Sequence, residues 1–186
     1  LKNGARGTTM CEVTEDLMCT GAMMGNYIEC DKRGRALGAV LGKSKKWRFA
    51  TKEGTELEGV IEGRPMQYET GLFREPSQFA AWPNSEINVA PIEGTANGKI
   101  VVNVRIMNIG VMRDEPTTLI VKDGLIVDAI GAGGIELMHL LESYGDPTAF
   151  NVAEFGLGLN PVSRMYANNL EDLGKWGTGH VGIGSN

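Results

Sequence analysis

The chain has 186 residues, a net charge of −5 and a pI of about 5.1. Its 42% hydrophobic and 22% charged residues are ordinary for a globular protein, so the length allows one domain, or one domain and part of another. An acidic chain has no electrostatic reason to bind a phosphate backbone, and its apolar runs are shorter than the ~20 residues that span a bilayer. We therefore expect neither a nucleic-acid nor a membrane partner.

Three cysteines, Cys11, Cys19 and Cys30, lie near the start of the chain. Their odd number and wide spacing fit neither a disulfide framework nor a zinc knuckle, so we expect reduced thiols and a cytoplasmic protein. Residues 1–7 lack the apolar core of a signal peptide. Because the chain begins with Leu and residues 184–186 resemble a turn, we interpret both ends as cuts.

Residues 10–42 are predicted to be mainly helical. Thr14, followed by two acidic residues, is a candidate N-cap, because its hydroxyl can accept from an amide of the first turn. Residues 36–41 are predicted to close a second short helix, with Gly42 as the stop.

From Trp47 onward, apolar and polar residues alternate with a period of two, which indicates β-strands. Residues 52–55 are predicted to be the turn of a first hairpin. The sequence Lys122-Asp123-Gly124 predicts another, because Asp-Gly accepts the positive φ of a tight turn. The further predicted strands are residues 87–90, 98–106, 117–121 and 125–130.

Residues 131–134, which contain three glycines, are predicted to interrupt the strands. Residues 135–144 follow as an amphipathic helix, with Ile135, Met138 and Leu141 facing inward and Leu137 as a further candidate.

This order of elements predicts an α+β fold, a mostly antiparallel β region with an inserted helix, preceded by helices. The change in pattern near residues 43–47 divides the chain into a helical segment, residues 1–44, and a β-rich domain, residues 45–186.

Glu86, Glu154 and His180 are the candidate metal ligands. Each glutamate is flanked by apolar residues, and a buried carboxylate is costly unless it is paired or metal-bound. His180 lies in residues 177–184, where four glycines surround one imidazole. Two carboxylates and one imidazole suit Zn²⁺, Co²⁺, Mn²⁺ or Fe²⁺. The alternative is that both glutamates are strand-end residues in water.

The remaining motifs favour no other chemistry. The other histidine, His139, lies within the predicted helix and is interpreted as a surface residue. No G-x-S-x-G elbow is present, so a serine nucleophile is disfavoured and the catalytic residues stay unknown. Residues 93–98 and 131–134 match neither phosphate-binding nor dinucleotide patterns, so we expect no nucleotide cofactor.

Three segments carry a resemblance to a known superfamily. They are E-x-x-x-A-P-x-E-G-x-A-N-G at residues 86–98, A-E-x-G-x-G-x-N-P at residues 153–161 and G-T-x-H-x-x-x-G at residues 177–184. In this order they resemble the aminopeptidase T (leucyl aminopeptidase, thermophilic metallopeptidase) superfamily, which includes relatives similar to 2,5-dihydroxypyridine 5,6-dioxygenase. The resemblance covers roughly residues 8–186.

The resemblance implies different roles in its two branches. In the peptidase branch, the residues matching Glu86, Glu154 and His180 bind two metal ions, completed by a later tyrosine and His-x-Asp pair. In the dioxygenase branch, the residue matching His180 and the later His-x-Asp pair bind one Fe(II). We also expect residues 1–44 to be the last helices of an N-terminal α/β domain, and this piece alone to be inactive.

Our main expectation is a metalloaminopeptidase-like hydrolase that removes N-terminal residues from small peptides at a site with two Zn, Co or Mn ions. One alternative is a mononuclear Fe(II) dioxygenase that cleaves a small aromatic ring, and another is a non-catalytic binding domain. A homo-oligomer is expected in each case, because open strand edges need covering.

Overall fold

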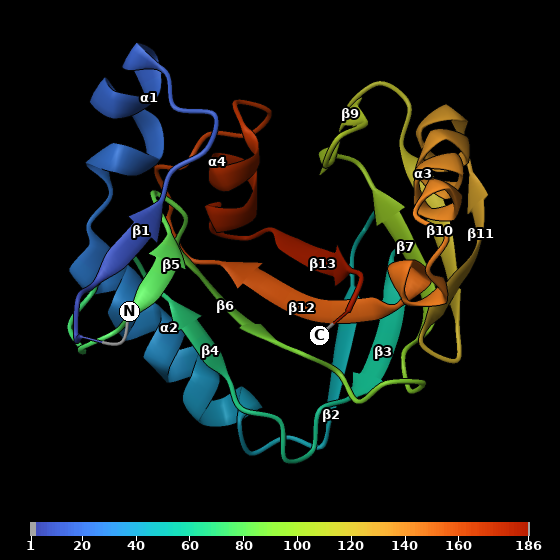
Figure 1. Ribbon diagram of the computed structural model, residues 1–186, viewed down its shortest axis with the longest axis horizontal. Coiled ribbons are helices and arrows are strands. Elements are labelled where there is room, and N and C mark those ends of the chain that lie inside the picture. The colour runs from blue at the N-terminus through green and yellow to red at the C-terminus, as the bar shows by residue number, and fades with distance from the viewer. Residues whose placement is uncertain (1–2, 186) are drawn as a thin grey trace. The chain divides into compact units, whose positions relative to one another are not determined.

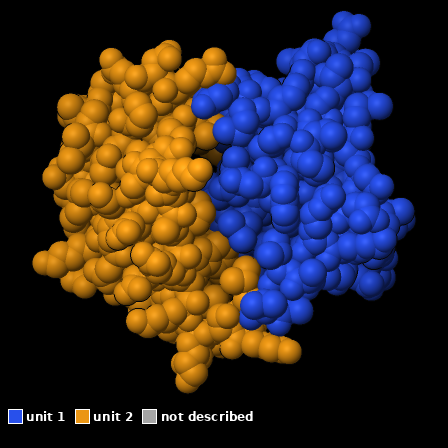
Figure 2. Space-filling view, turned by 180° about the vertical axis from the view of Figure 1, so that it is seen from behind, with its two compact units in different colours: residues 1–40, 66–88, 156–180 blue, residues 41–65, 89–155, 181–186 orange. Residues whose placement is uncertain are grey.

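The computed structural model describes residues 3–185 (Figure 1). Its segments form two compact units, each assembled from stretches that are distant in sequence (Figure 2). The first unit comprises Leu1–Val40, Met66–Asn88 and Gly156–His180, and the second comprises Leu41–Pro65, Val89–Phe155 and Val181–Asn186. The division of the chain between residues 44 and 45 stays a prediction.

Helices are few and mostly short, and none of those described is long and apolar enough to cross a bilayer. They are α1 (Glu15–Cys19), the 3-10 turn η1 (Gly21–Met24), α2 (Tyr27–Leu41), α3 (Ala132–Ser143), the 3-10 turn η2 (Pro147–Phe150) and α4 (Asn169–Gly174). Thr14 caps α1 as predicted, since its Oγ1 accepts a hydrogen bond from the Leu17 amide at 3.1 Å. The predicted helix at residues 36–41 is the end of the longer helix α2.

The strands form two larger sheets and two strand pairs. The five-stranded sheet has the order β11 (Leu125–Ile130), β10 (Thr117–Lys122), β7 (Asn97–Val102), β3 (Glu56–Val60), β2 (Lys46–Ala50). The four-stranded sheet has the order β13 (Gly179–Ile183), β12 (Val152–Gly158), β6 (Glu86–Val89), β4 (Gln67–Glu69). The pairs are β1 (Gly7–Thr9) with β5 (Phe79–Ala81), and β8 (Arg105–Ile106) with β9 (Gly110–Val111).

Both predicted hairpins are confirmed in the five-stranded sheet. Strands β2 and β3 pair antiparallel, and so do β10 and β11. Asp123 and Gly124 both have positive φ, 49° and 81°, as an Asp-Gly turn requires. Because the paired strands are mostly antiparallel and the helices are few, the α+β fold class is confirmed.

The start of helix α3 differs from its prediction. The strands end at Ile130, as predicted, but the helix begins at Ala132, before the predicted start at Ile135, and includes Gly133 and Gly134. A Cβ on Gly133 would lie 2.5 Å from the Met112 sulfur, and one on Gly134 would lie 2.8 Å from the Ala129 Cβ. These glycines therefore permit close packing of the helix and do not break it.

The predicted inward face of α3 is only partly confirmed. Leu137 and Leu141 are buried, as is Gly134, but Ile135 is 55% exposed. Starting the helix at Ala132 turns the buried face toward Gly134, Leu137 and Leu141, which recur at helical spacing.

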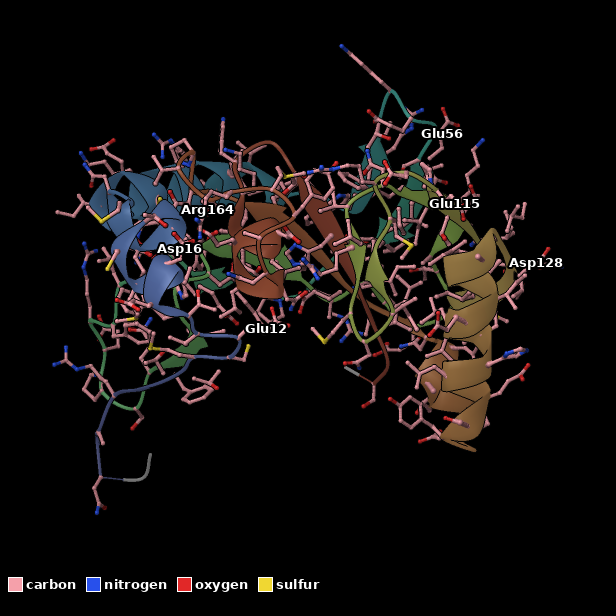
Figure 3. The ribbon with its side chains drawn as sticks, turned by 90° about the horizontal axis from the view of Figure 1, so that it is seen from above. Glu12, Asp16, Glu56, Glu115, Asp128 and Arg164 are labelled. Carbon is pink, nitrogen blue, oxygen red and sulfur yellow. The ribbon has the colours of Figure 1, made fainter. Side chains whose placement is uncertain are left out.

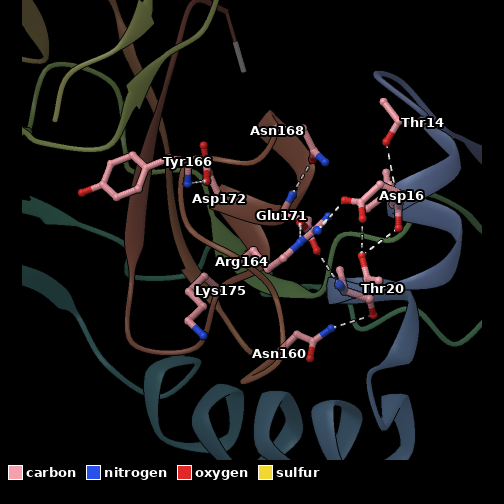
Figure 4. Close-up of polar contacts among 12 residues, drawn as sticks. Thr14, Asp16, Thr20, Asn160, Arg164, Tyr166, Asn168, Glu171, Asp172 and Lys175 are labelled. Carbon is pink, nitrogen blue, oxygen red and sulfur yellow. Dashed lines mark hydrogen bonds and ion pairs between the residues drawn. The ribbon is translucent and has the colours of Figure 1, made fainter.

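In the first unit, a buried carboxylate joins the N-terminal segment to helix α4 (Figure 4). Glu171 is fully buried and accepts hydrogen bonds from the Ala22 amide and from Arg164 Nε, the latter at 2.7 Å. Arg164 also pairs with Asp16 on α1, and the two side chains point toward each other in Figure 3. Asn168 caps α4 by accepting from the Glu171 amide. A buried carboxylate held by charged and backbone donors fixes the relative places of these segments.

A second buried carboxylate anchors helix α2. Asp31 accepts a hydrogen bond from Thr70 at 2.8 Å and pairs with Arg35 and Arg74, each at 3.0 Å. Burial is the largest influence and raises the pKa of the Asp31 carboxyl, but hydrogen bonds and the two guanidinium charges outweigh it. The pKa is therefore lowered from its ordinary value.

We predict that Asp31→Asn lowers the free energy of unfolding near neutral pH by about 1.5–3 kcal/mol, because charged hydrogen bonds are lost. Because the folded-state pKa lies below the unfolded value, this stabilisation is complete above the unfolded pKa of about 4 and disappears as pH falls through the folded-state pKa. Urea unfolding at several pH values measures the difference. Glu29→Gln, which removes an exposed i,i+3 pair with Lys32, is the control and should change little.

Candidate metal centre

Glu86 is a buried carboxylate at the start of strand β6. All four residues of this strand are buried, and Glu86 itself is 4% exposed. The alternative that Glu86 is a strand-end residue in water is therefore wrong. A carboxylate in this setting needs a compensating partner, because desolvation of the charge is costly.

His180 supplies that partner from strand β13. Its Nε2 lies 3.4 Å from Glu86 Oε2, and both side chains are largely shielded from solvent. Burial is the largest influence and raises the pKa of the Glu86 carboxyl, yet the charge of protonated His180 and nearby amide donors outweigh it. The pKa of Glu86 is therefore lowered from its ordinary value.

Two strand glycines provide the space that these side chains occupy. A Cβ on Gly156 would lie 1.9 Å from His180 Nε2, and a Cβ on Gly182 would lie 2.8 Å from the Glu154 Cβ. Any other residue at position 156 would displace the imidazole. Gly156 and Gly182 thus leave the volume that His180 and Glu154 occupy.

Of the three residues in the predicted ligand group, Glu86 and His180 belong to the first unit and lie together, and Glu154 belongs to the second unit. That Glu154 shares a metal ion with the other two stays a prediction. Glu154 is half-buried on β12. His139 is exposed on α3 and is not in this group.

Two buried asparagines, which were not predicted from the sequence, lie beside Glu86. Asn84 and Asn88 are each 2% exposed, and Asn88 Nδ2 donates to Glu86 Oε1 at 2.9 Å. The signal was available, because residues i and i+2 of a strand share a face, and Glu86 and Asn88 are polar in an otherwise apolar strand.

The chain matches one protein family over most of its length. The family described as "NicX: 2,5-dihydroxypyridine 5,6-dioxygenase" matches residues 1–175. The 2,5-dihydroxypyridine 5,6-dioxygenase of Pseudomonas putida is 28% identical over 151 residues, which are 77% of this chain and 42% of that protein.

Solved structures show the same fold. The 2,5-dihydroxypyridine dioxygenase of Pseudomonas putida KT2440 superposes with a TM-score of 0.78 and 22% identity, over 94% of this chain and 52% of that one. AmpT from Thermus thermophilus superposes with a TM-score of 0.55 and 16% identity, over 80% and 39%. The chain thus spans about half the length, or less, of the relatives it matches.

These findings confirm the superfamily resemblance and correct the choice between its branches. The expected metalloaminopeptidase is wrong, since the family match and the sequence relative are both dioxygenases, while AmpT shares the fold at lower similarity. The expected hydrolase and peptidase activities are therefore not supported either. The error has a chemical cause: two carboxylates and an imidazole suit several divalent metals, so the ligand types alone do not specify the reaction.

We predict that Gly156→Ala weakens divalent metal binding by on the order of 10-fold or more, because the new methyl group displaces His180 from its position. Equilibrium dialysis against Co²⁺ or Fe²⁺ measures the loss. Gly59→Ala is the matched control, because this glycine of β3 packs against Phe155 and Pro91 and no candidate ligand. It should lower stability and leave metal affinity unchanged; equal metal loss in both variants would contradict the prediction.

Proposed function

We propose that this chain contributes a metal centre to a dioxygenase that opens the ring of a small hydroxylated pyridine. The reason is that the chain belongs to the 2,5-dihydroxypyridine 5,6-dioxygenase family. The metal would be a single Fe(II), with Glu86, Glu154 and His180 as the residues nearest to it. Since the chain covers 42% of the curated relative, activity and substrate are proposed for the whole protein.

The observation that carries this proposal is the buried pair of Glu86 and His180. Glu86 Oε2 accepts no hydrogen bond of normal geometry from the described residues, although it is shielded from water. A buried anionic oxygen without a hydrogen bond carries a desolvation cost, and a divalent cation beside it would compensate its charge. Imidazole and carboxylate are also the donor types of non-haem Fe(II) oxygenases, although their usual triad has two imidazoles and one carboxylate.

Each residue has a distinct part in this proposal. His180 would offer its Nε2 to the metal, and Gly156 leaves the space in which that nitrogen lies. Glu86 would supply negative charge from a site that excludes water, where electrostatic interactions are strong. When bound, Fe(II) would supply the redox chemistry that brings O₂ and the aromatic ring together.

We expect the whole protein, prepared anaerobically, to bind about one Fe(II) per chain and to consume O₂ when 2,5-dihydroxypyridine is added. His180→Ala should reduce metal affinity by on the order of 100-fold, because a ligand contributes more than the outer-shell groups whose loss costs 10–100-fold. Elemental analysis and an oxygen electrode make the two measurements. His139→Ala is the matched control, since this exposed histidine lies outside the site, and it should behave as the wild type.

Two other results of the metal and oxygen measurements would count against the proposal. Two Zn, Co or Mn ions per chain, with no O₂ consumption, would contradict the proposal. A protein that binds no metal would leave the non-catalytic binding domain as the remaining interpretation. Self-association stays a separate prediction, which light scattering measures; β2 and β11 are the outer strands of the five-stranded sheet.

A further inference from the structure

Strand β6 buries a second polar side chain whose hydrogen bonding is only half satisfied. Asn88 donates from Nδ2 to Glu86 Oε1 at 2.9 Å, while its Oδ1 is buried without a hydrogen bond from the described residues. The amide orientation follows from this contact, because the opposite orientation would place two acceptor oxygens together. Asn88 is therefore a donor to Glu86.

This hydrogen bond distinguishes the two oxygens of the carboxylate. Oε1 is held by Asn88, and Oε2 lies 3.4 Å from His180 Nε2. The terminal torsion of a glutamate is broad, so the carboxylate plane is poorly fixed unless a neighbour holds it. Asn88 makes the hydrogen bond to Oε1 at 2.9 Å, the Asn84 side chain also lies close to the carboxylate, and Oε2 remains directed at His180.

A purely structural role explains Asn88 poorly. A buried amide with one unsatisfied acceptor carries a desolvation cost that a leucine of similar volume would avoid. An asparagine kept for stability would be expected to satisfy both ends of its amide, as buried polar groups normally do.

We infer that Asn88 is a positioning residue, which holds the Glu86 carboxylate so that Oε2 is presented to His180 and to a divalent cation bound beside it. The inference rests on the proposed metal centre. Asn88 acts only through Glu86, in the manner of the outer-shell groups that orient metal-ligating carboxylates.

The test uses Co²⁺ as a probe, since its visible absorption reports ligand geometry and its affinity can be measured by competition with a chelator. Asn88→Leu should bind Co²⁺ about 10–100-fold more weakly than the wild type, with an altered visible spectrum. Its urea midpoint should also fall, because the buried Glu86 Oε1 loses its donor, so the Co²⁺ affinity and spectrum carry the comparison with the control.

A matched control comes from Asn160, which is fully buried and donates from Nδ2 to the Ala22 carbonyl at 3.0 Å. Asn160→Leu should lower the urea midpoint and leave Co²⁺ affinity and spectrum unchanged. A double-mutant cycle then tests whether Asn88 acts through Glu86. In a Glu86→Gln background, Asn88→Leu should change Co²⁺ affinity by less than about 2-fold, because the effects of coupled residues are not additive.

The outcomes separate this inference from the proposed function. Co²⁺ binding by the wild type, with equal affinity in Asn88→Leu, overturns the role of Asn88 and leaves the metal centre standing. An Asn88→Leu effect that persists in full in the Glu86→Gln background shows that Asn88 does not act through Glu86, and also overturns it. A wild type that binds neither Co²⁺ nor Fe²⁺ overturns both proposals.

Discussion

The burial of one carboxylate, Glu86, is the constraint on which the candidate site depends. An ionised carboxylate removed from water must be compensated, and the surroundings of Glu86 do this from two directions. Asn88 donates to one oxygen, and His180 faces the other at 3.4 Å. Without this pair, strand β6 would be an ordinary buried strand. With it, the strand holds a negative charge suited to a cation.

Glycine decides how closely the surrounding backbone can approach that pair. Gly156 is the clearest case, because its missing Cβ is the volume in which His180 Nε2 lies. A similar use of glycine recurs at Gly133 and Gly134, where α3 packs against its neighbours without side chains in the way. In both places glycine serves close packing more than chain flexibility, and substitution would displace a specific neighbour.

The candidate ligand types do not by themselves specify one reaction. Carboxylate and imidazole bind Zn²⁺, Mn²⁺ and Fe²⁺, so these residues are compatible with hydrolysis and with oxygen chemistry. The fold is shared with AmpT as well as with a dioxygenase, which is consistent with function residing in details of the site. The family match over residues 1–175 made the distinction that the ligand set did not.

The sequence by itself determined the local elements and the candidate ligands. Period-two alternation and the Asp-Gly turn predicted the β10–β11 hairpin, because side-chain alternation and positive φ are local properties. It also singled out Glu86, Glu154 and His180 from their apolar and glycine-rich surroundings. Only the tertiary structure decided that Glu86 is buried and that Asn88 is its donor, and that Gly133 and Gly134 continue a helix. Burial and close approach depend on which segments meet, and segments such as β6 and β13 are about ninety residues apart in the chain.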